Sequence, residues 1–436
     1  MKNKSAIAVT TIVLVAVTVR FVWLLLVVNR QWSDVQYYDE AACHLAHHLE
    51  LRYIDPTIPA LHYRAWFPPG WPFFLAFFHF LFGDSPWIVK IVNLVLSALI
   101  VWLIIQIGTR IFSQRVGLIG GLLWALLPGQ IVYVSLSQYE VFLTALIVGI
   151  VYLLVMDDWA TVTWQSPRLH VLGVALAWAT MTRPLLVFFP LALAPYLIQM
   201  SGRRRGWLWT GILSVYIGVA CLGWGLRNIA VLGEPVIFST NGGYNLWHGN
   251  NPNATGGAFS PPHSTDPGLN PDALGTNELV LNRECYRYAM AYIRANPRRF
   301  IAMMPRRLLH LYNTDTTGLY LSFLYSPLEH PTLLEPLRHE SHFAETLTVR
   351  TYLFAMLFVL IGLCTANWRV PHIRLLGYIF LYWHFWVLIT FGQDRYRVPI
   401  MPLYCLFAGH AVQQLILVIA ARTSAFSRKA TAPSAA

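Results

Sequence analysis

Long apolar stretches alternate with short polar segments along most of the chain. A stretch of about 20 apolar residues is long enough to cross a bilayer as a helix. We therefore predict about ten membrane spans, with a range of roughly nine to twelve. The predicted spans are residues 6–28, 87–109, 116–133, 139–156, 169–182, 184–200, 207–228, 350–366, 372–391 and 398–420. The apolar segment 71–82 is too short to span, and we expect it to re-enter the membrane or to lie in its interface.

Two segments between the spans, 29–86 and 229–349, are much longer than the others. Within the second, residues 233–272 are rich in Gly, Pro and Asn and predict an irregular loop with tight turns. Residues 276–312 interleave Arg with apolar residues, which predicts an amphipathic helix on the membrane surface, broken at Pro297 and Pro305.

The predicted domain organisation follows from these segments. An N-terminal membrane module, 1–228, includes the first long loop. The second long loop, 229–349, follows it and leads to C-terminal membrane helices, 350–421. The last residues, 422–436, are polar and predict a disordered tail.

The composition supports an all-α integral membrane protein. The chain is 56% hydrophobic and 12% charged, whereas soluble domains carry about 25% charged residues. The net charge of +11 does not indicate nucleic-acid binding, because much of the basic excess lies in loops between apolar runs. The five Cys are scattered and form no disulfide framework. The N-terminal apolar run is too long for a signal-peptide core, so we predict a retained first span.

The basic residues also predict the orientation. The short segments on one side contain most of the Lys and Arg, including the run at 203–205. The short turns on the other side hold only Arg183, Arg395 and Arg397. The positive-inside rule then places both termini in the cytoplasm and both long loops outside.

Three acids follow the first span within the segment "WSDVQYYDE". Asp34 is either a solvated loop acid or a site residue, and the dense aromatic loop around it favours a site. Asp39 and Glu40 begin a predicted helix at 39–51, where acids in the first turn are favoured by the helix dipole. A catalytic role for this pair is the alternative.

Three histidines at i, i+3 and i+4 spacing, His44, His47 and His48, share one face of the same predicted helix. Such a face can bind a metal or simply form the polar side of an interfacial helix. No metal-binding signature accompanies them, so we predict no metal ligands and no required cofactor, although a divalent metal is compatible with the chemistry below.

Several charged residues lie at the predicted outer ends of spans. An ionisable group at that depth is costly unless it faces a cavity. These residues, together with the first loop, predict a polar cavity that opens outward, in which acids handle a proton and arginines hold an anion. They are Glu140 and the arginines Arg183, Arg227, Arg395 and Arg397. Arg64, in the first loop, is either a further phosphate ligand or an interfacial anchor.

A fitting reaction is transfer from a lipid-linked phosphate donor. The lipid tail stays in the bilayer, and the phosphate leaving group needs Arg or a metal to stabilise its charge. A hydroxyl or amine acceptor needs a carboxylate base, and a carboxylate also stabilises an oxocarbenium-like transition state.

The order of these pieces resembles the bacterial membrane glycosyltransferases of the GT-C superfamily, family 39 type, which are related to protein O-mannosyltransferases and lipid A aminoarabinose transferases. The resemblance extends from about residue 32 to 410. The matching segments are "SDVQYYDEAACHLAHHL", "YRAWFPPGWPFFLAFFHFLFG", "TRP", "RNIAVLGEPVIFSTNGGYNLWHGNNPNATGG" and "QDRYRVPIMPLYCLFAGH".

The resemblance implies a GT-C-like helical bundle in the bacterial inner membrane with an outward active site. It implies an inverting transfer of sugar from a polyprenyl-phosphate donor, with Asp34 as the base and the Asp39–Glu40 pair as the alternative. Cys43 departs from the pattern that normally follows that pair. The same segments contribute the substrate-binding candidates Tyr37, Tyr63, Asn241, Asn245, Asn250 and Asp394, besides Glu140.

The acceptor is a lipid, a glycan or a protein. The soluble module of many protein mannosyltransferases is absent from the long loops, which argues against a protein acceptor and leaves lipid and glycan acceptors open. A flippase of lipid-linked sugars is the alternative function. It predicts ionisable residues near mid-span and often repeated halves, whereas the charges here gather at one face and no repeat is present.

Overall fold

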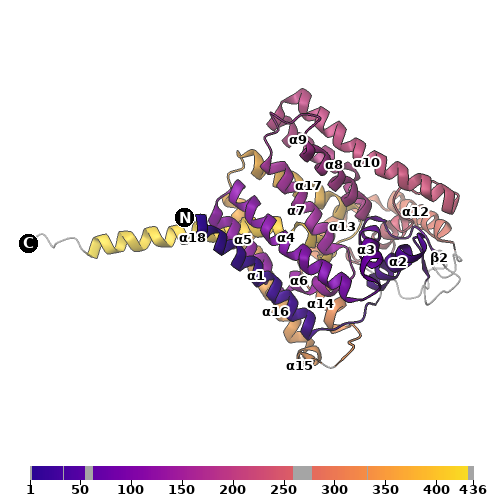
Figure 1. Cartoon of the computed structure of the whole chain (residues 1–436), viewed down its shortest axis with the longest axis horizontal. Helices are drawn as coiled ribbons and strands as arrows, with labels where there is room; N and C mark the ends of the chain where they lie inside the picture. Colours follow the sequence, from indigo (N-terminus) through magenta and orange to yellow (C-terminus); the bar gives the residue numbers. More distant parts are fainter. Residues whose placement is uncertain (1, 33, 55–61, 259–276, 331, 431–436) are drawn as a thin grey trace, which may run out of the picture.

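Helices form nearly all of the structure in this computed structural model (Figure 1), which describes residues 2–32, 34–54, 62–258, 277–330 and 332–430. The first half contains α1 (Lys2–Leu26), α2 (Asp34–His48), β1 (Tyr53–Ile54), β2 (His62–Tyr63), α3 (Gly70–Phe82), α4 (Trp87–Ile111), α5 (Gln114–Leu126), α6 (Pro128–Ile131), η1 (Val132–Ser135), α7 (Glu140–Met156), α8 (Pro167–Thr182), η2 (Pro184–Phe188), α9 (Phe189–Ser201) and α10 (Arg203–Leu232). The second half contains α11 (Gly242–Gly249), α12 (Glu278–Ala295), α13 (Pro297–Tyr312), α14 (Thr317–Leu319), η4 (Tyr320–Leu324), α15 (Glu335–His339), α16 (Ser341–Thr365), α17 (Pro371–Ile389), η5 (Asp394–Ile400) and α18 (Met401–Ala430). Within the described residues, β1 and β2 are the only strands, and they pair antiparallel with Tyr53 opposite Tyr63.

Each of the ten predicted spans corresponds to helix, but fewer qualify as spans by length and composition. Among the described residues, seven helices are long and apolar enough to cross a membrane, and an eighth qualifies if the pair α5 and α6–η1, bent by 75°, counts as one span. The predicted spans at 139–156 and 169–182 are α7 and α8, which have 17 and 16 residues. Both are short because α7 begins only at Glu140 and Pro184 follows the end of α8, where its ring prevents the helix from continuing.

Three boundaries differ from the sequence predictions. The helix of the first loop begins at Asp34 rather than at Asp39, so Asp34 is its first-turn acid, and Asp39 and Glu40 lie inside α2. In the second loop Pro297 separates α12 from α13 as predicted, because Pro is well suited to the first turn of a helix.

Pro305, in contrast, lies within α13 and does not end it. At the C-terminus, α18 continues to Ala430, so the predicted disordered tail is helical over its first part. Residues 431–436 of that tail lie outside the described residues.

Small residues allow the central helices to pack closely. A Cβ atom at Gly117 of α5 would lie 2.4 Å from the Ile105 carbonyl oxygen of α4. A Cβ atom at Gly362 of α16 would lie 2.0 Å from the Phe407 carbonyl oxygen of α18. Helices in membranes associate through such close contacts, since burial from lipid gives little driving force. The resulting core of α4, α5, α7 and α18 supports the site described next.

Both long loops contribute elements to the same end of the molecule. In Figure 1, α2, β2 and α3 of the first loop lie beside α12 of the second, at the end opposite to the N-terminus. The N-terminus lies beside α18 at the other end, where the C-terminal part of α18 projects away from the bundle.

Candidate active site

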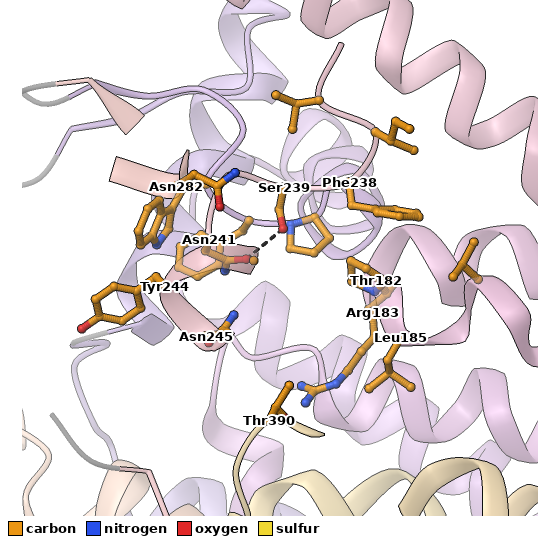
Figure 2. A pocket seen from close by; sticks show the side chains of 18 of the residues that line it. Thr182, Arg183, Leu185, Phe238, Ser239, Asn241, Tyr244, Asn245, Asn282 and Thr390 are labelled. Carbon is orange, nitrogen blue, oxygen red and sulfur yellow. Dashed lines mark hydrogen bonds between the residues drawn. The ribbon is translucent and has the colours of Figure 1, made fainter. Parts of the chain in front are cut away.

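A cavity of about 1560 Å³ lies where the two long loops meet the ends of the spans. Figure 2 shows Arg183 on one wall and Asn241, Tyr244, Asn245 and Asn282 on the opposite wall. The polar part of the lining also includes Asp34, Tyr37, Tyr38, Tyr63, Tyr139, Ser239, Arg395 and Tyr396. The cavity therefore gathers side chains from α2, η5, α11, α12 and the turn after α8.

Asp34 and Arg395 form an ion pair across this cavity. Asp34 begins α2, and its Oδ2 lies 3.5 Å from Nη1 of Arg395 in η5. The Asp34 side chain is 45% exposed, so solvent or a substrate can reach it. Because the contact is longer than a strong charge-assisted hydrogen bond, the carboxylate retains oxygen lone pairs for another partner.

A second arginine lies beside the first. Arg183 donates a hydrogen bond to the Tyr139 hydroxyl, and its guanidinium carbon lies 4.0 Å from the Tyr396 ring centroid. The guanidinium carbon of Arg395 lies 5.5 Å from the same ring centroid. Cation–π contacts of this kind hold a guanidinium in place while leaving donors free. The cavity thus contains two positioned cations and one accessible carboxylate.

Glu140 lies behind these cations, at the start of α7. It is 1% exposed, and neither of its carboxylate oxygens has a hydrogen-bond partner among the described residues. A buried carboxylate is costly without compensating charge. Arg395 and Arg183 are the two cations that interact with it electrostatically, so Glu140 helps to retain both guanidinium groups at the cavity.

Arg397 has a different role from Arg395, although both lie in η5. It is fully buried, and its Nη2 lies 2.8 Å from Asp315 Oδ1 and 2.9 Å from the Thr314 carbonyl oxygen. Asp394 is also buried and accepts hydrogen bonds from Thr316 N and Thr317 N at 2.7 and 2.9 Å. In the described structure neither Arg397 nor Asp394 lines the cavity, and both fasten η5 to the segment before α14.

Arg227 and Arg64 join α10 to the first loop. Arg227 Nη1 donates to the Arg64 carbonyl oxygen at 3.0 Å, and its guanidinium carbon lies 4.7 Å from the Trp224 ring centroid. Arg64 Nε lies 3.7 Å from Glu50 Oε1. Neither arginine lines the cavity in the described part of the chain.

Of the predicted substrate-binding residues, some line the cavity and others make contacts elsewhere in the fold. Tyr37, Tyr63, Asn241 and Asn245 line the cavity. Asn250 instead accepts a hydrogen bond from Arg307 Nη2 at 2.7 Å.

The acids of the alternative assignment face away from the cavity. Asp39 Oδ1 lies 3.4 Å from His79 Nε2 on α3, and Glu40 accepts an exposed hydrogen bond from Gln36. The structure therefore brings Asp34, Arg183 and Arg395 together and leaves Asp39 and Glu40 outside the cavity.

Sequence reasoning missed the aromatic residues between the charged groups. Tyr38, Tyr139 and Tyr396 line the cavity. Burial raises the pKa of Tyr38 well above its usual value, so its hydroxyl stays neutral and can donate a hydrogen bond. The sequence does contain a signal for two of these tyrosines, because Tyr139 and Tyr396 are each next to a predicted charged site residue.

Two histidines of the predicted face contact other protein groups. His44 Nδ1 contacts the Glu50 carbonyl oxygen at 2.9 Å, and His47 pairs with Asp84. Among the described residues, the group with metal-binding spacing is Asp39, Cys43 and His79, outside the cavity.

The Glu278 carboxylate joins the two long loops. It is 4% exposed and accepts hydrogen bonds from Arg64 N at 2.9 Å, Ala65 N at 3.3 Å and Thr240 Oγ1 at 2.6 Å. Burial raises the pKa of Glu278, and these hydrogen bonds oppose that rise. The carboxylate thereby holds two cavity walls, one from each loop, against each other.

Glu278→Ala is expected to lower the free energy of unfolding by about 1–3 kcal/mol, because it leaves these donors without an acceptor. Thermal unfolding of the purified protein in detergent measures the change. Glu284→Ala, on an exposed face of α12 where Glu284 pairs with Arg287, is the matched control and should change stability little. Equal losses for both variants would contradict the joining role.

Residues 67–224 match the family model of the dolichyl-phosphate-mannose-protein mannosyltransferases. No curated protein matches the chain.

The fold is similar to that of the Archaeoglobus fulgidus oligosaccharyltransferase. The structure with a tethered acceptor peptide aligns with a TM-score of 0.57 and 12% identity, over 95% of this chain and 50% of that one. The structure of the same enzyme, AglB, with an inhibitory peptide and a dolichol-phosphate has a TM-score of 0.53 and 12% identity, over 97% and 52% of the two chains. The chain therefore spans about half the length of these oligosaccharyltransferases.

A further match is ArnT from Cupriavidus metallidurans bound to undecaprenyl phosphate. Its TM-score is 0.40 at 15% identity, over 93% of this chain and 77% of that one. The family-model match and the oligosaccharyltransferase fold confirm the predicted resemblance to GT-C proteins and the all-α membrane fold.

Proposed function

We propose that the protein is an inverting membrane glycosyltransferase that moves a sugar from a polyprenyl-phosphate lipid to an acceptor in this cavity. The observation that carries the proposal is the pairing of the accessible Asp34 carboxylate with Arg395, beside Arg183, in one cavity. A transferase of this kind needs one base for the acceptor and cations for the leaving phosphate.

One wall of the cavity suits the lipid tail. Its lining includes Val187, Phe188 and Leu191 of η2 and α9, and Ile217 and Cys221 of α10. Phe188 and Leu191 are also more than half exposed, so a lipid chain can contact them. A polyprenyl chain can therefore reach the cavity from the bilayer while its phosphate lies near Arg183 and Arg395.

The reaction we propose is a single displacement. The acceptor hydroxyl or amine attacks the anomeric carbon of the sugar and gives its proton to the Asp34 carboxylate. The bond between that carbon and the phosphate oxygen breaks, and its electron pair leaves with polyprenyl phosphate, whose charge Arg395 and Arg183 stabilise. The configuration at the anomeric carbon inverts, and no cofactor takes part.

Because Asp34 pairs with Arg395 before the donor binds, donor binding at Arg395 also changes the contacts of Asp34. A donor phosphate that binds Arg395 competes with Asp34 for the same guanidinium. Asp34 then loses its contact with Arg395, and its carboxylate can contact the acceptor instead.

The opposite wall suits a polar acceptor. Asn241, Asn245 and Asn282 offer amide donors and acceptors, and Trp66 and Tyr63 offer aromatic faces. The acceptor class proposed is a lipid, glycan or protein that presents a hydroxyl or amine. We further propose that the cavity faces the exterior of a bacterial inner membrane with both termini in the cytoplasm, because the positive-inside rule supports this orientation.

Donor binding can be tested with a native probe, because Cys221 lines the lipid wall. Polyprenyl phosphate is expected to slow alkylation of Cys221 by a maleimide, measured by peptide mass spectrometry on the purified protein. Cys364, an exposed cysteine of α16 outside the cavity lining, is the internal control and should react at the same rate with and without lipid. Unchanged labelling of Cys221 at saturating lipid would contradict the proposed tail path.

The activity itself can be tested in cells. Deletion of the gene is expected to lower the mass of one envelope lipid, glycan or protein by one sugar residue, and the wild-type gene should restore it. Mass spectrometry of extracted envelope components measures the change and identifies the sugar and acceptor. Identical envelope masses with and without the protein, under conditions where the protein is made, would contradict the transferase proposal.

A further inference from the structure

A cluster of three potential metal ligands lies outside the cavity, between α2 and α3. Asp39 and Cys43 are one turn apart on α2, and His79 lies on α3. One ligand atom of each residue lies within 4.8 Å of the other two. None of the three lines the cavity, so the proposed transfer reaction does not explain them.

The histidine is oriented as a ligand. His79 is fully buried, and its Nδ1 lies 3.1 Å from the Gly83 carbonyl oxygen. A carbonyl oxygen only accepts hydrogen bonds, so this contact places a ring hydrogen on Nδ1. In the neutral imidazole, Nε2 then carries a lone pair. Metal-binding histidines are commonly oriented by such a contact to a backbone carbonyl.

The lone pair of Nε2 points to a second acceptor. Nε2 of His79 and Oδ1 of Asp39 lie 3.4 Å apart, and both are buried without a hydrogen-bond partner among the described residues. Two unprotonated acceptors repel each other unless a proton or a cation lies between them. A charge-assisted hydrogen bond would bring them to about 2.7–2.9 Å, and they are farther apart than that.

The separation matches two ligands of one metal ion. Zinc binds imidazole nitrogen and carboxylate oxygen at about 2.0–2.2 Å in tetrahedral geometry, which places two such ligand atoms roughly 3.3–3.6 Å apart. Cys43 adds a thiolate ligand, and a thiolate, imidazole and carboxylate set favours zinc over magnesium or calcium, which prefer oxygen ligands.

We propose that Asp39, Cys43 and His79 form a zinc site that fastens α2 to α3. A water molecule completes the tetrahedral coordination. The nearest ligand of the site, Asp39, lies less than two turns along α2 from Asp34. The metal therefore holds the helix that positions the proposed base without entering the cavity. Cys43, which departs from the family pattern, thereby gains a role as a ligand.

The test uses cobalt(II) as a spectroscopic substitute for zinc in the purified full-length protein. After removal of metal with a chelator, one equivalent of cobalt(II) is expected to produce thiolate-to-metal charge-transfer absorption, which zinc(II) then abolishes by displacement. Cys43→Ser should lose this absorption. Cys285→Ser, which removes a buried cysteine of α12 outside the cluster, should keep it.

Stability provides an independent readout. Zinc added to the chelated wild-type protein should raise its thermal unfolding midpoint, because a ligand that binds only the folded state stabilises it. The midpoint of Cys43→Ser should not respond. Absence of the charge-transfer band in the folded wild-type protein, or an equal band in Cys43→Ser, would overturn the proposal and leave His79 and Asp39 as a protonated ion pair.

Discussion

Asp34→Asn is expected to lower sugar transfer by a factor of about 10²–10⁴, the usual contribution of a general base. Asparagine keeps the size of the side chain but cannot accept the acceptor proton. Because Asp34 is partly exposed and its ion pair with Arg395 is long, the variant should fold and insert normally. The transfer rate of the purified variant, at the same concentration as wild type, checks the loss of activity. Its size-exclusion profile checks that it folds normally.

Glu40→Gln is the matched control on the same helix. Glu40 lies outside the cavity, and its contact is an exposed hydrogen bond from Gln36, so transfer should remain near the wild-type rate. Full activity in Asp34→Asn combined with strong loss in Glu40→Gln would restore the alternative assignment of the base to the Asp39–Glu40 pair.

Arg397→Gln is expected to destabilise the fold by about 3–5 kcal/mol, because it leaves Asp315 as an uncompensated buried charge. The ion pair at 2.8 Å is almost completely buried, with side-chain exposures of 0% and 3%. The variant also loses a hydrogen bond to the Thr314 carbonyl oxygen. Thermal unfolding in detergent, together with the yield of monodisperse protein, measures the loss.

Arg395→Gln should show the opposite behaviour. Arg395 faces the cavity, and Arg183 remains as a cation beside Glu140, so the loss of Arg395 should lower the folded yield far less than Arg397→Gln does. Transfer should fall by about 10²–10³, as when one charge-stabilising donor is removed from an active site. A stable but inactive Arg397→Gln, or an unfolded Arg395→Gln, would contradict the division of roles within η5.

The sequence predicted the parts of the fold that depend on apolar length. Each predicted span is helical, since a bilayer requires the backbone to satisfy its own hydrogen bonds. The gathering of Asp34, Arg183 and Arg395 was also predictable, because all three lie at predicted outer ends of spans or just beyond them. Span ends on one side of a membrane must meet in one layer, whatever the packing of the helices.

The roles of individual arginines were not predictable in this way. Arg395 and Arg397 are two residues apart, yet one faces the cavity and the other pairs with Asp315, about 80 positions earlier in the chain. Such a partner is set by tertiary packing, and the local pattern "QDRYRVP" does not contain it. The same holds for Arg227, whose carbonyl partner belongs to Arg64 in the first loop.

The cluster of Asp39, Cys43 and His79 was also not predictable from the sequence. His79 lies within an apolar run, where a single histidine predicts no partner. The three residues meet only because α3 packs against α2 in the first loop. Asp39 and Cys43 share a face of α2 at i, i+4 spacing, and neither lines the cavity.

A stoichiometric assay in proteoliposomes tests most directly whether the protein transfers sugar from polyprenyl phosphate. The purified protein is reconstituted with a polyprenyl-phosphate sugar and supplied with an extract of envelope acceptors. We expect one free polyprenyl phosphate for each sugar transferred by the wild-type protein, and almost none for Asp34→Asn. Movement of intact lipid-linked sugar across the bilayer, with no release of polyprenyl phosphate, would contradict the transferase and identify a flippase.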